Sequence, residues 1–281
     1  MLEFAIKTAP HHAEWADMLD VWRAADEMDV FVEAWNFDHF YPLSDPREGP
    51  CLEAWTTLTA LAQATERIRV GCMVNGMHYR HPAVTANMAA SLDIISGGRF
   101  NLGLGAGWYE LESKAYGIEL GTMKERMDRF DEGVEVVISL LSNETTNFEG
   151  EHYRLEDARC EPKPVQRPTP PIVIGGKGEK RTLRTVARHG DYWDAMFPGS
   201  VKEWQRLDGV LLEHCEAVGR DPGEIRRSTH FRWPADLDVN ELVDSALEYG
   251  GAGLDVAIVG MGQPYDASRL EPLAEAIRAA G

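Results

Sequence analysis

The first residues that could do chemistry are an acid and an imidazole that stand side by side, Asp38 and His39. They lie in the run NFDHFY at residues 36–41, directly after a short apolar stretch that predicts a strand. Flanking aromatic residues could place this imidazole in a pocket, and histidine titrates near neutrality, so His39 is a candidate for proton transfer. A loop histidine that simply faces water is the alternative interpretation.

A second candidate is a glycine-rich turn that ends in two aromatic residues. Residues 103–110 read GLGAGWYE, so that Gly105 and Gly107 alternate with other residues ahead of Trp108. Alternating glycines let a flat ligand approach the backbone closely, and the aromatic pair favours a stacking surface. Tight packing inside the fold would give the same pattern. Another turn, VNGMHY at residues 74–79, contains Asn75 and is equally compatible with a site or a plain turn.

A third candidate is a local basic stretch in an acidic chain. Gly175, Gly176 and Lys177 precede a predicted helix, and residues 177–188 carry five basic side chains against one acid. Backbone N–H groups at a helix start, together with the positive end of the helix dipole, favour an anion. We therefore prefer a phosphate site over a solvated basic helix face.

The elements that must position these residues alternate between strand-like and helical patterns. The apolar spacing predicts eight strands that are each followed by a helix, which favours an α/β fold and a (β/α)8 barrel with active-site loops at the carboxyl ends of its strands. A doubly wound sheet would show a glycine-rich turn after the first strand, and KTAP at residues 7–10 is not one. We expect one barrel domain over residues 1–281, with an insertion around residues 142–171. The predicted strands are 4–7, 32–36, 68–74, 100–104, 172–174, 191–196, 225–231 and 254–259.

Composition narrows the classes of partner. The 281 residues contain 28 Lys and Arg against 46 Asp and Glu, for a formal net charge of −18. An acidic surface repels phosphate backbones and anionic lipid, so we expect no nucleic-acid or membrane partner. The four cysteines are far apart, no metal-ligand spacing and no Gly-x-Ser-x-Gly elbow is present, and no secretion signal is apparent. These features indicate a cytoplasmic protein without a metal.

Taken together, these segments resemble the bacterial luciferase-like monooxygenase superfamily, and within it the branch of coenzyme F420-dependent oxidoreductases. The resemblance covers residues 31–194, and the family fold is a (β/α)8 barrel with insertions. Its most specific parts are FDHF at 37–40, HPAVTANMAASLDIISGGRFNLGLGAGWYELE at 81–112, PKPVQRPTPPIVIGG at 162–176 and RTLRTVARHGDYWDA at 181–195.

The resemblance implies a flavin or deazaflavin that lies across the strand ends. His39 matches the catalytic or cofactor-facing histidine of F420-using relatives. Met73 and Val74 match a bulge that often carries a non-proline cis peptide behind the ring, and Gly175 to Lys177 match the phosphate loop. The expected cofactor-binding residues are Asp38, His39, Met73, Val74, Asn75, Gly105, Gly107, Trp108, Gly175, Gly176 and Lys177.

One departure from a known branch matters. F420-dependent glucose-6-phosphate dehydrogenases carry a glutamate after the fourth-strand glycines, where this chain has Trp108. We therefore expect His39 to handle the proton or to stabilise developing charge, and Trp108 to shape the substrate side, in an oxidoreductase that moves a hydride between F420 and a small organic substrate. The alternatives are an FMN-dependent monooxygenase that uses reduced flavin and O2, and a non-catalytic flavin-binding barrel. By analogy with relatives, we expect a homodimer.

Overall fold

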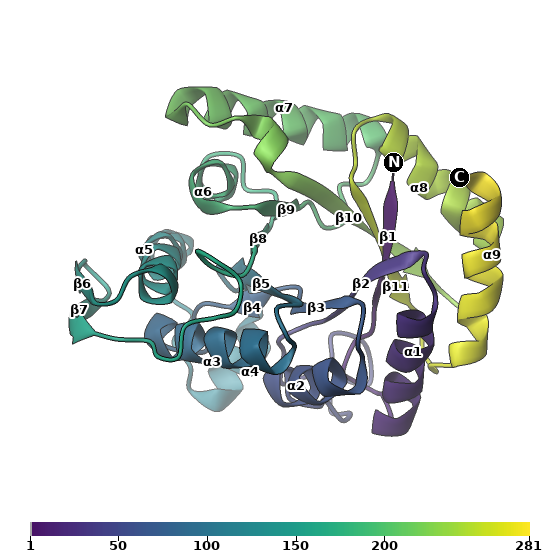
Figure 1. The fold of residues 1–281 in the computed structure, drawn as a ribbon, viewed down its shortest axis with the longest axis horizontal. Coiled ribbons are helices and arrows are strands. Elements are labelled where there is room, and N and C mark those ends of the chain that lie inside the picture. Colours follow the sequence, from purple (N-terminus) through teal and green to yellow (C-terminus); the bar gives the residue numbers. More distant parts are fainter. Residues whose placement is uncertain (1) are drawn as a thin grey trace.

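The computed structural model describes residues 2–281, and its centre is a closed barrel of parallel strands (Figure 1). Neighbouring strands pair in parallel around the ring, which closes where β3 pairs with β5. The predicted (β/α)8 barrel is therefore confirmed. The barrel strands are β1 (Glu3–Lys7), β2 (Phe31–Asn36), β3 (Arg69–Cys72) with β4 (Asn75–Gly76), β5 (Phe100–Gly105), β8 (Ile172–Gly175), β9 (Tyr192–Asp194), β10 (Arg226–Trp233) and β11 (Val256–Met261).

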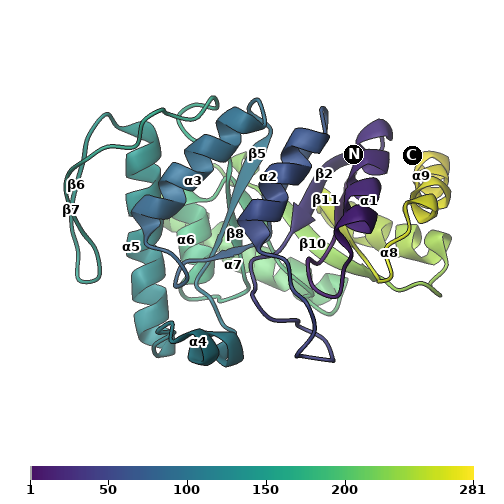
Figure 2. The ribbon, with the colours of Figure 1, turned by 90° about the horizontal axis from the view of Figure 1, so that it is seen from below.

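Helices connect the strands and cover the outside of the barrel (Figures 1 and 2). In residues 2–281, none of them combines the length and apolar character that crossing a membrane requires. They are α1 (Trp15–Glu27), α2 (Ala54–Ala64), α3 (Pro82–Ile95), α4 (Glu110–Tyr116), α5 (Met123–Ser142), α6 (Thr182–His189), α7 (Val201–Val218), α8 (Val239–Gly251) and α9 (Leu270–Ala280).

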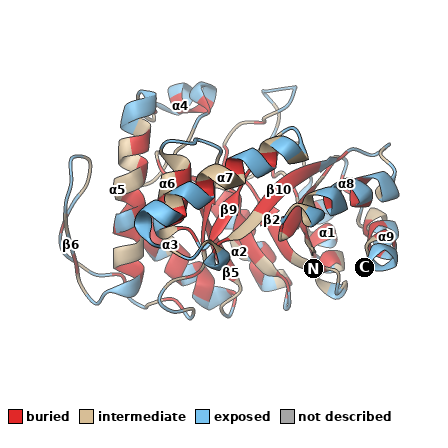
Figure 3. Ribbon diagram, turned by 90° about the horizontal axis from the view of Figure 1, so that it is seen from above, coloured by how far each residue is buried: buried red, intermediate tan, exposed pale blue. Residues whose placement is uncertain are grey.

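The core has two parts, because each strand is covered on both faces. One part fills the space between strands and helices, and the other fills the barrel lumen with side chains such as Ala5, Trp35 and Tyr192. Figure 3 shows the resulting pattern, with buried residues on the strands and exposed residues on the outer helix surfaces. Strands buried on both faces explain the apolar runs that predicted them.

The third barrel strand is interrupted at the site. β3 ends at Cys72 and β4 begins at Asn75, and the peptide bond between Met73 and Val74 is cis. The sequence resemblance implies such a bond at this position.

Two elements were not predicted. The predicted insertion contains an antiparallel hairpin, β6 (Thr146–Glu149) with β7 (Arg154–Ala158), which lies beside α5 (Figure 2). The hairpin turn is held by the Glu132 carboxylate of α5, which accepts from the backbone N–H groups of residues 151–153. The short helix α4 follows β5 and ends at Gly117, whose φ of 67° is left-handed. A helix of two turns leaves little periodic signal in a sequence.

Candidate functional site

His39 lies just beyond the carboxyl end of β2, where its ring is held by a buried carboxylate. His39 Nδ1 is 2.5 Å from Glu112 Oε1, and the Glu112 side chain has no exposed surface. Glu112 comes from α4, which carries it across to the loop after β2. A carboxylate at this atom accepts the Nδ1 proton, so the pair holds the imidazole in one orientation and leaves Nε2 for a proton transfer.

Glu112 is also the acceptor for the surrounding loop. Its Oε2 accepts from the backbone N–H groups of Phe40 at 2.7 Å and Tyr41 at 3.2 Å, while Oε1 also accepts from the Tyr79 hydroxyl. Burial would raise the pKa of Glu112, but the hydrogen bonds from His39 and these donors outweigh it and leave the pKa below its ordinary value. The group is therefore a carboxylate at neutral pH. Burial, reinforced by Glu112, raises the pKa of Tyr79, which keeps its hydroxyl protonated.

Aromatic rings surround His39. Phe37, Trp108 and Tyr109 each lie edge-on to its imidazole, with centroid distances of 5.2, 5.6 and 5.6 Å. Trp108 is 56% exposed although it contacts this buried group. The arrangement brings together the two residues predicted to be catalytic, and it presents an indole to solvent beside the imidazole.

Asp38 lies behind this site rather than on its surface. Its carboxylate is buried and pairs with Arg80 at 2.6 and 3.1 Å, while it also accepts from the Gly76 N–H at 3.2 Å. Arg80 contacts Glu53 at 2.9 Å. Burial raises the pKa of Asp38, and the adjacent guanidinium opposes that rise. Asp38 therefore connects the loop after β2, in which it lies, to β4 through the Gly76 N–H.

Glycines line the place where Val74 packs. A Cβ at Gly105 would lie 2.6 Å from Val74 Cγ2, and one at Gly175 would lie 2.9 Å from Val74 Cγ1. Close packing against Val74 is therefore a reason for glycine at both positions, and for Gly105 it is the alternative that the sequence left open. Asn75 donates to the Gly103 carbonyl at 2.7 Å, and Lys7 donates to the Met73 carbonyl at 3.1 Å.

Gly107 has a separate reason to be glycine. Its φ is +87°, and a Cβ there would lie 2.1 Å from His78 Nδ1. His78 Nε2 lies 3.2 Å from Ser113 Oγ on α4. Burial lowers the pKa of His78 to about 4, so this second imidazole is neutral at physiological pH. Gly107 and His78 therefore support α4 and, through it, Glu112.

The basic stretch after β8 divides into two parts. Arg181 pairs with Asp128 and Asp131 on α5, each at 2.5 Å, and Arg184 also contacts Asp131 at 3.3 Å. α6 begins at Thr182, so Lys177 lies five residues before the first residue of this helix. Lys177 points elsewhere and donates to the Phe197 carbonyl at 2.7 Å. Two of the five basic side chains thus join α6 to α5, and Lys177 remains at the strand ends with Gly175 and Gly176.

The sequence analysis did not identify a cluster of buried titratable side chains inside the barrel, toward the carboxyl ends of the strands. Lys7 ends β1, Asp194 ends β9, and His230 lies near the end of β10 with its Nε2 3.2 Å from Asp194 Oδ2. Burial lowers the pKa of Lys7 to about 8, against the opposing charge of Asp194. Among residues 2–281 no set of three or more His, Cys, Asp or Glu side chains is arranged to hold a metal ion. The sequence signal that could have identified this cluster is a charged residue, Lys7, at the end of an apolar strand.

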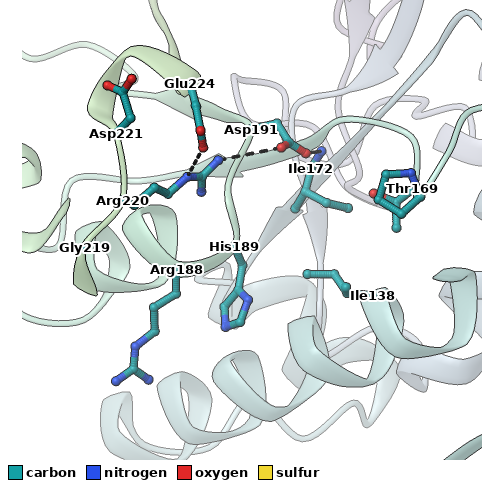
Figure 4. A pocket seen from close by; sticks show the side chains of 11 residues that line it. Ile138, Thr169, Ile172, Arg188, His189, Asp191, Gly219, Arg220, Asp221 and Glu224 are labelled. Carbon is teal, nitrogen blue, oxygen red and sulfur yellow. Dashed lines mark hydrogen bonds and ion pairs between the residues drawn. The ribbon is translucent and has the colours of Figure 1, made fainter. Parts of the chain in front are cut away.

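A cavity of about 420 Å3 lies at the opposite end of the barrel (Figure 4). It is lined by Ile172, which begins β8, and by Asp191, which precedes β9. Its Arg220 contacts Glu224 at 3.3 Å and Asp191 at 3.8 Å. Barrel enzymes carry their chemistry at the carboxyl ends of the strands, so this cavity is separate from the site around His39.

Comparison with known proteins gives a consistent picture of the family. The family model for luciferase-like monooxygenases matches residues 1–275. An F420-dependent hydroxymycolic acid dehydrogenase from Mycobacterium tuberculosis is 32% identical over 213 residues, which are 75% of this chain and 57% of that protein. The pyrimidine monooxygenase RutA from Allorhizobium ampelinum is 33% identical over 176 residues, 61% of this chain and 46% of that protein. The chain therefore spans about half the length of these curated relatives.

A solved structure confirms the architecture. An F420-dependent secondary alcohol dehydrogenase in complex with an F420-acetone adduct superposes with a TM-score of 0.86 over 100% of this chain and 99% of that chain. Its sequence is 19% identical. This similarity establishes the fold, and the family resemblance found in the sequence is confirmed by the family match.

Proposed function

The chain belongs to the luciferase-like monooxygenase family, and on that basis we propose that it is an oxidoreductase that moves a hydride between coenzyme F420 and a small organic substrate. The observation that carries this proposal is the His39–Glu112 pair at the carboxyl end of the barrel, beside the exposed ring of Trp108. The similarity to an F420-dependent hydroxymycolic acid dehydrogenase and to the structure of an F420-dependent secondary alcohol dehydrogenase supports the same cofactor.

The residues at the strand ends fit a flat cofactor with an anionic arm. The Val74 side chain covers Gly105 and Gly175, which gives an apolar surface at the centre of the barrel mouth. Lys177 supplies a cation whose hydrogen bond is to a neutral carbonyl, and it adjoins the backbone of Gly176. We assign the ring to the Met73–Val74 side and the phosphate to the Gly175–Lys177 segment.

The bound cofactor would supply the hydride-accepting or hydride-donating carbon. When an alcohol is oxidised to a carbonyl, its hydroxyl proton must leave as the hydride departs, and His39 Nε2 accepts it. In the reverse direction His39 returns the proton to the carbonyl oxygen. Glu112 keeps the other ring nitrogen protonated, so the proton moves through a single atom of His39.

Trp108 has a positioning role in this scheme. Its indole lies edge-on to His39 and covers the site on the solvent side. Hydride transfer depends on close placement of donor and acceptor carbons, and a rigid aromatic wall limits where a substrate can lie.

A substitution at His39 tests the assignment. We expect His39→Asn to retain F420 binding, followed by Trp fluorescence quenching, and to lose most of its turnover with alcohols or carbonyls as substrates. The matched control is His214→Asn on the outer helix α7, where the imidazole forms a hydrogen bond with the Glu179 carbonyl at 2.7 Å. Full turnover in the His39 variant would show that the proton passes elsewhere.

The second candidate is an FMN-dependent monooxygenase, and the similarity to a pyrimidine monooxygenase favours it. Titration of the protein with F420 and with FMN separates the two. We expect quenching that saturates with F420. Tight FMN binding without an F420 response would replace the first proposal with the second, and bound flavin without turnover of any acceptor would favour the non-catalytic barrel.

A further inference from the structure

A second cavity, of about 390 Å3, adjoins the barrel mouth between the end of β10 and α8. Phe197 from the loop after β9 and His230 and Arg232 from β10 line it, together with residues of α8 that include Glu241 and Tyr249. We call it the Phe197 pocket. Because it is built from the carboxyl ends of β9 and β10, it opens on the same end of the barrel as His39.

Two cations contact Phe197, Lys177 from the loop after β8 and Arg232 from β10. The Arg232 guanidinium lies 4.7 Å from the centroid of the Phe197 ring, and Lys177 Nζ donates to the Phe197 carbonyl at 2.7 Å. Among residues 2–281, neither cation has a carboxylate oxygen within 4.0 Å, although the chain has 46 acidic against 28 basic side chains. Glu241 lines the same cavity without pairing with Arg232.

The wall that these cations contact has an unusual backbone. Phe197 has a φ of 49°, a left-handed conformation that is uncommon for an aromatic residue. The residue is 38% exposed, and its ring lies edge-on to His230 with a centroid distance of 5.5 Å. Conformations of this kind persist where surrounding contacts enforce them, and they concentrate at ligand sites.

The pocket is also lined by the buried imidazole of His230, whose Nε2 faces a carboxylate but lacks good hydrogen-bond geometry. The His230 side chain is 3% exposed, and its Nε2 lies near Asp194 Oδ2 without an aligned hydrogen bond. Burial lowers the pKa of His230, and the neighbouring Lys7 lowers it further, while Asp194 raises it. An anion in the cavity would stabilise the protonated ring against this burial.

We propose that the Phe197 pocket binds a carboxylate or phosphate group of a small organic molecule, with Arg232 as the charged partner and His230 as a proton-dependent donor. The Arg232 guanidinium and the protonated His230 imidazole provide the donors that such a group requires, and the Phe197 ring provides an apolar wall for the organic part of the molecule. If the bound group belongs to the substrate, the proposal rests on the proposed function, and the substrate is then an anionic compound. The anion could equally belong to the cofactor's own arm.

Calorimetric titration with benzoate and with inorganic phosphate tests the anion site without any turnover. We expect both probes to bind the wild-type protein. Arg232→Gln should weaken benzoate binding about tenfold or more, because a charge-assisted contact is lost. Arg23→Gln on α1 removes the same charge from an exposed position outside the pocket, and it should leave the affinity unchanged.

The pH dependence tests the role of His230. Benzoate remains ionised between pH 6 and 8, so a rise in its affinity toward pH 6 reports protonation on the protein. The charged neighbours of His230 are Asp194 and Lys7, and Arg232 and Glu241 line the same pocket. We expect His230→Asn to bind benzoate with a flatter pH profile than the wild type. An equal pH profile in both proteins would overturn the role of His230.

A titration in the presence of F420 identifies the source of the anion. Simultaneous binding of F420 and benzoate assigns the pocket to the substrate, whereas mutual competition assigns it to the cofactor arm. Absence of binding by both probes, or an equal loss of affinity in Arg23→Gln and Arg232→Gln, would overturn the anion site itself. Failure of F420 to bind would refute the proposed cofactor and leave the benzoate result standing.

Discussion

Replacing Glu112 by Gln is the sharpest test of how His39 is held. The carboxylate has two acceptor oxygens with two donors each: His39 Nδ1 and the Tyr79 hydroxyl at Oε1, and the N–H groups of Phe40 and Tyr41 at Oε2. Glutamine has the same shape but only one oxygen. Its amide nitrogen must therefore face one pair of donors.

The two pairs differ in their ability to adapt. The backbone N–H groups of Phe40 and Tyr41 cannot become acceptors, so the glutamine oxygen is expected to stay with them. The Tyr79 hydroxyl can rotate, and a neutral imidazole can move its proton from Nδ1 to Nε2 and accept at Nδ1. We therefore expect Glu112→Gln to switch the tautomer of His39 rather than to unfold the site.

The expected magnitudes follow from this rearrangement. Hydrogen bonds to a charged acceptor contribute about 1 kcal/mol more than neutral ones, and relief from burying a charge offsets part of the loss. We expect a loss of about 1–3 kcal/mol in the free energy of unfolding at pH 7. The wrong tautomer removes the base from Nε2, and we expect turnover to fall by about 10²–10⁴-fold.

The pH dependence of this stability difference has a definite sign. The folded-state pKa of Glu112 lies below its ordinary value of 4.5, so its stabilisation is present above that value and is lost as the pH falls through the folded pKa. The wild-type protein should therefore approach the Glu112→Gln variant in acid. Urea unfolding at several pH values measures the convergence.

The assay for the tautomer is ¹⁵N NMR of the imidazole nitrogens. Glu110→Gln is the matched control, because Glu110 occupies the same first turn of α4 but is exposed. We expect it to leave the tautomer, the stability and the turnover of the wild type unchanged. If Glu112→Gln also keeps the His39 proton on Nδ1 and retains full turnover, the assigned role of this carboxylate is wrong.

Three further substitutions address other parts of the site. Burial lowers the pKa of Lys7 from 10.5 to about 8, so the unfolded chain binds more protons than the folded one between these pH values. The wild type should therefore gain stability relative to Lys7→Met as the pH rises through this window. Urea unfolding should show a gain of up to about 3 kcal/mol in the free energy of unfolding. Arg80→Met leaves the Asp38 carboxylate buried without its partner and should destabilise the protein by about 3–5 kcal/mol in the same assay. Gly107→Ala combines a left-handed φ with a collision at His78 Nδ1 and should lower the free energy of unfolding by more than about 2 kcal/mol.

Controls separate the causes in these variants. Gly199 has a similar φ of +93°, but a Cβ there meets nothing within 4 Å, so Gly199→Ala should show only the backbone cost of about 1–2 kcal/mol. Adding Asp38→Asn to Arg80→Met removes the unpaired charge and should recover part of the stability. A pH-independent difference between the wild type and Lys7→Met would contradict the lowered pKa of Lys7.

The barrel could be predicted because its strands and helices repeat with regular apolar spacing. Each strand is buried on both faces and each longer helix has one buried face, so both leave their period in the sequence. The hairpin within residues 142–171 and the helix α4 left no such period. The hairpin strands are short and mostly exposed, and its turn is held by Glu132 of α5, a contact made only after folding.

The candidate site could be predicted only in part for the same reason. His39 and Trp108 stand at the ends of recognisable strands, and the structure brings them into contact. Glu112 depends on α4, which turns it back toward the loop after β2, and nothing in its local sequence shows that direction. The sequence predicts that Lys7 ends a strand, but it does not show whether the Lys7 side chain faces the lumen or the helices. Alternate side chains of a strand point to opposite faces, so a shift of one residue in the assignment exchanges the two faces.

The basic segment shows why a local charge count cannot assign an anion site. Residues 177–188 look like one positive surface in the sequence, yet the folded chain uses Arg181 and Arg184 to neutralise carboxylates of α5. Lys177 is directed to the barrel mouth, where it donates to the Phe197 carbonyl while Arg232 lies over the Phe197 ring. The positive field at the mouth thus depends on two residues 55 positions apart in the sequence. Because the −18 chain repels anions in general, Lys177 and Arg232 favour an anionic group at the barrel mouth through their position there.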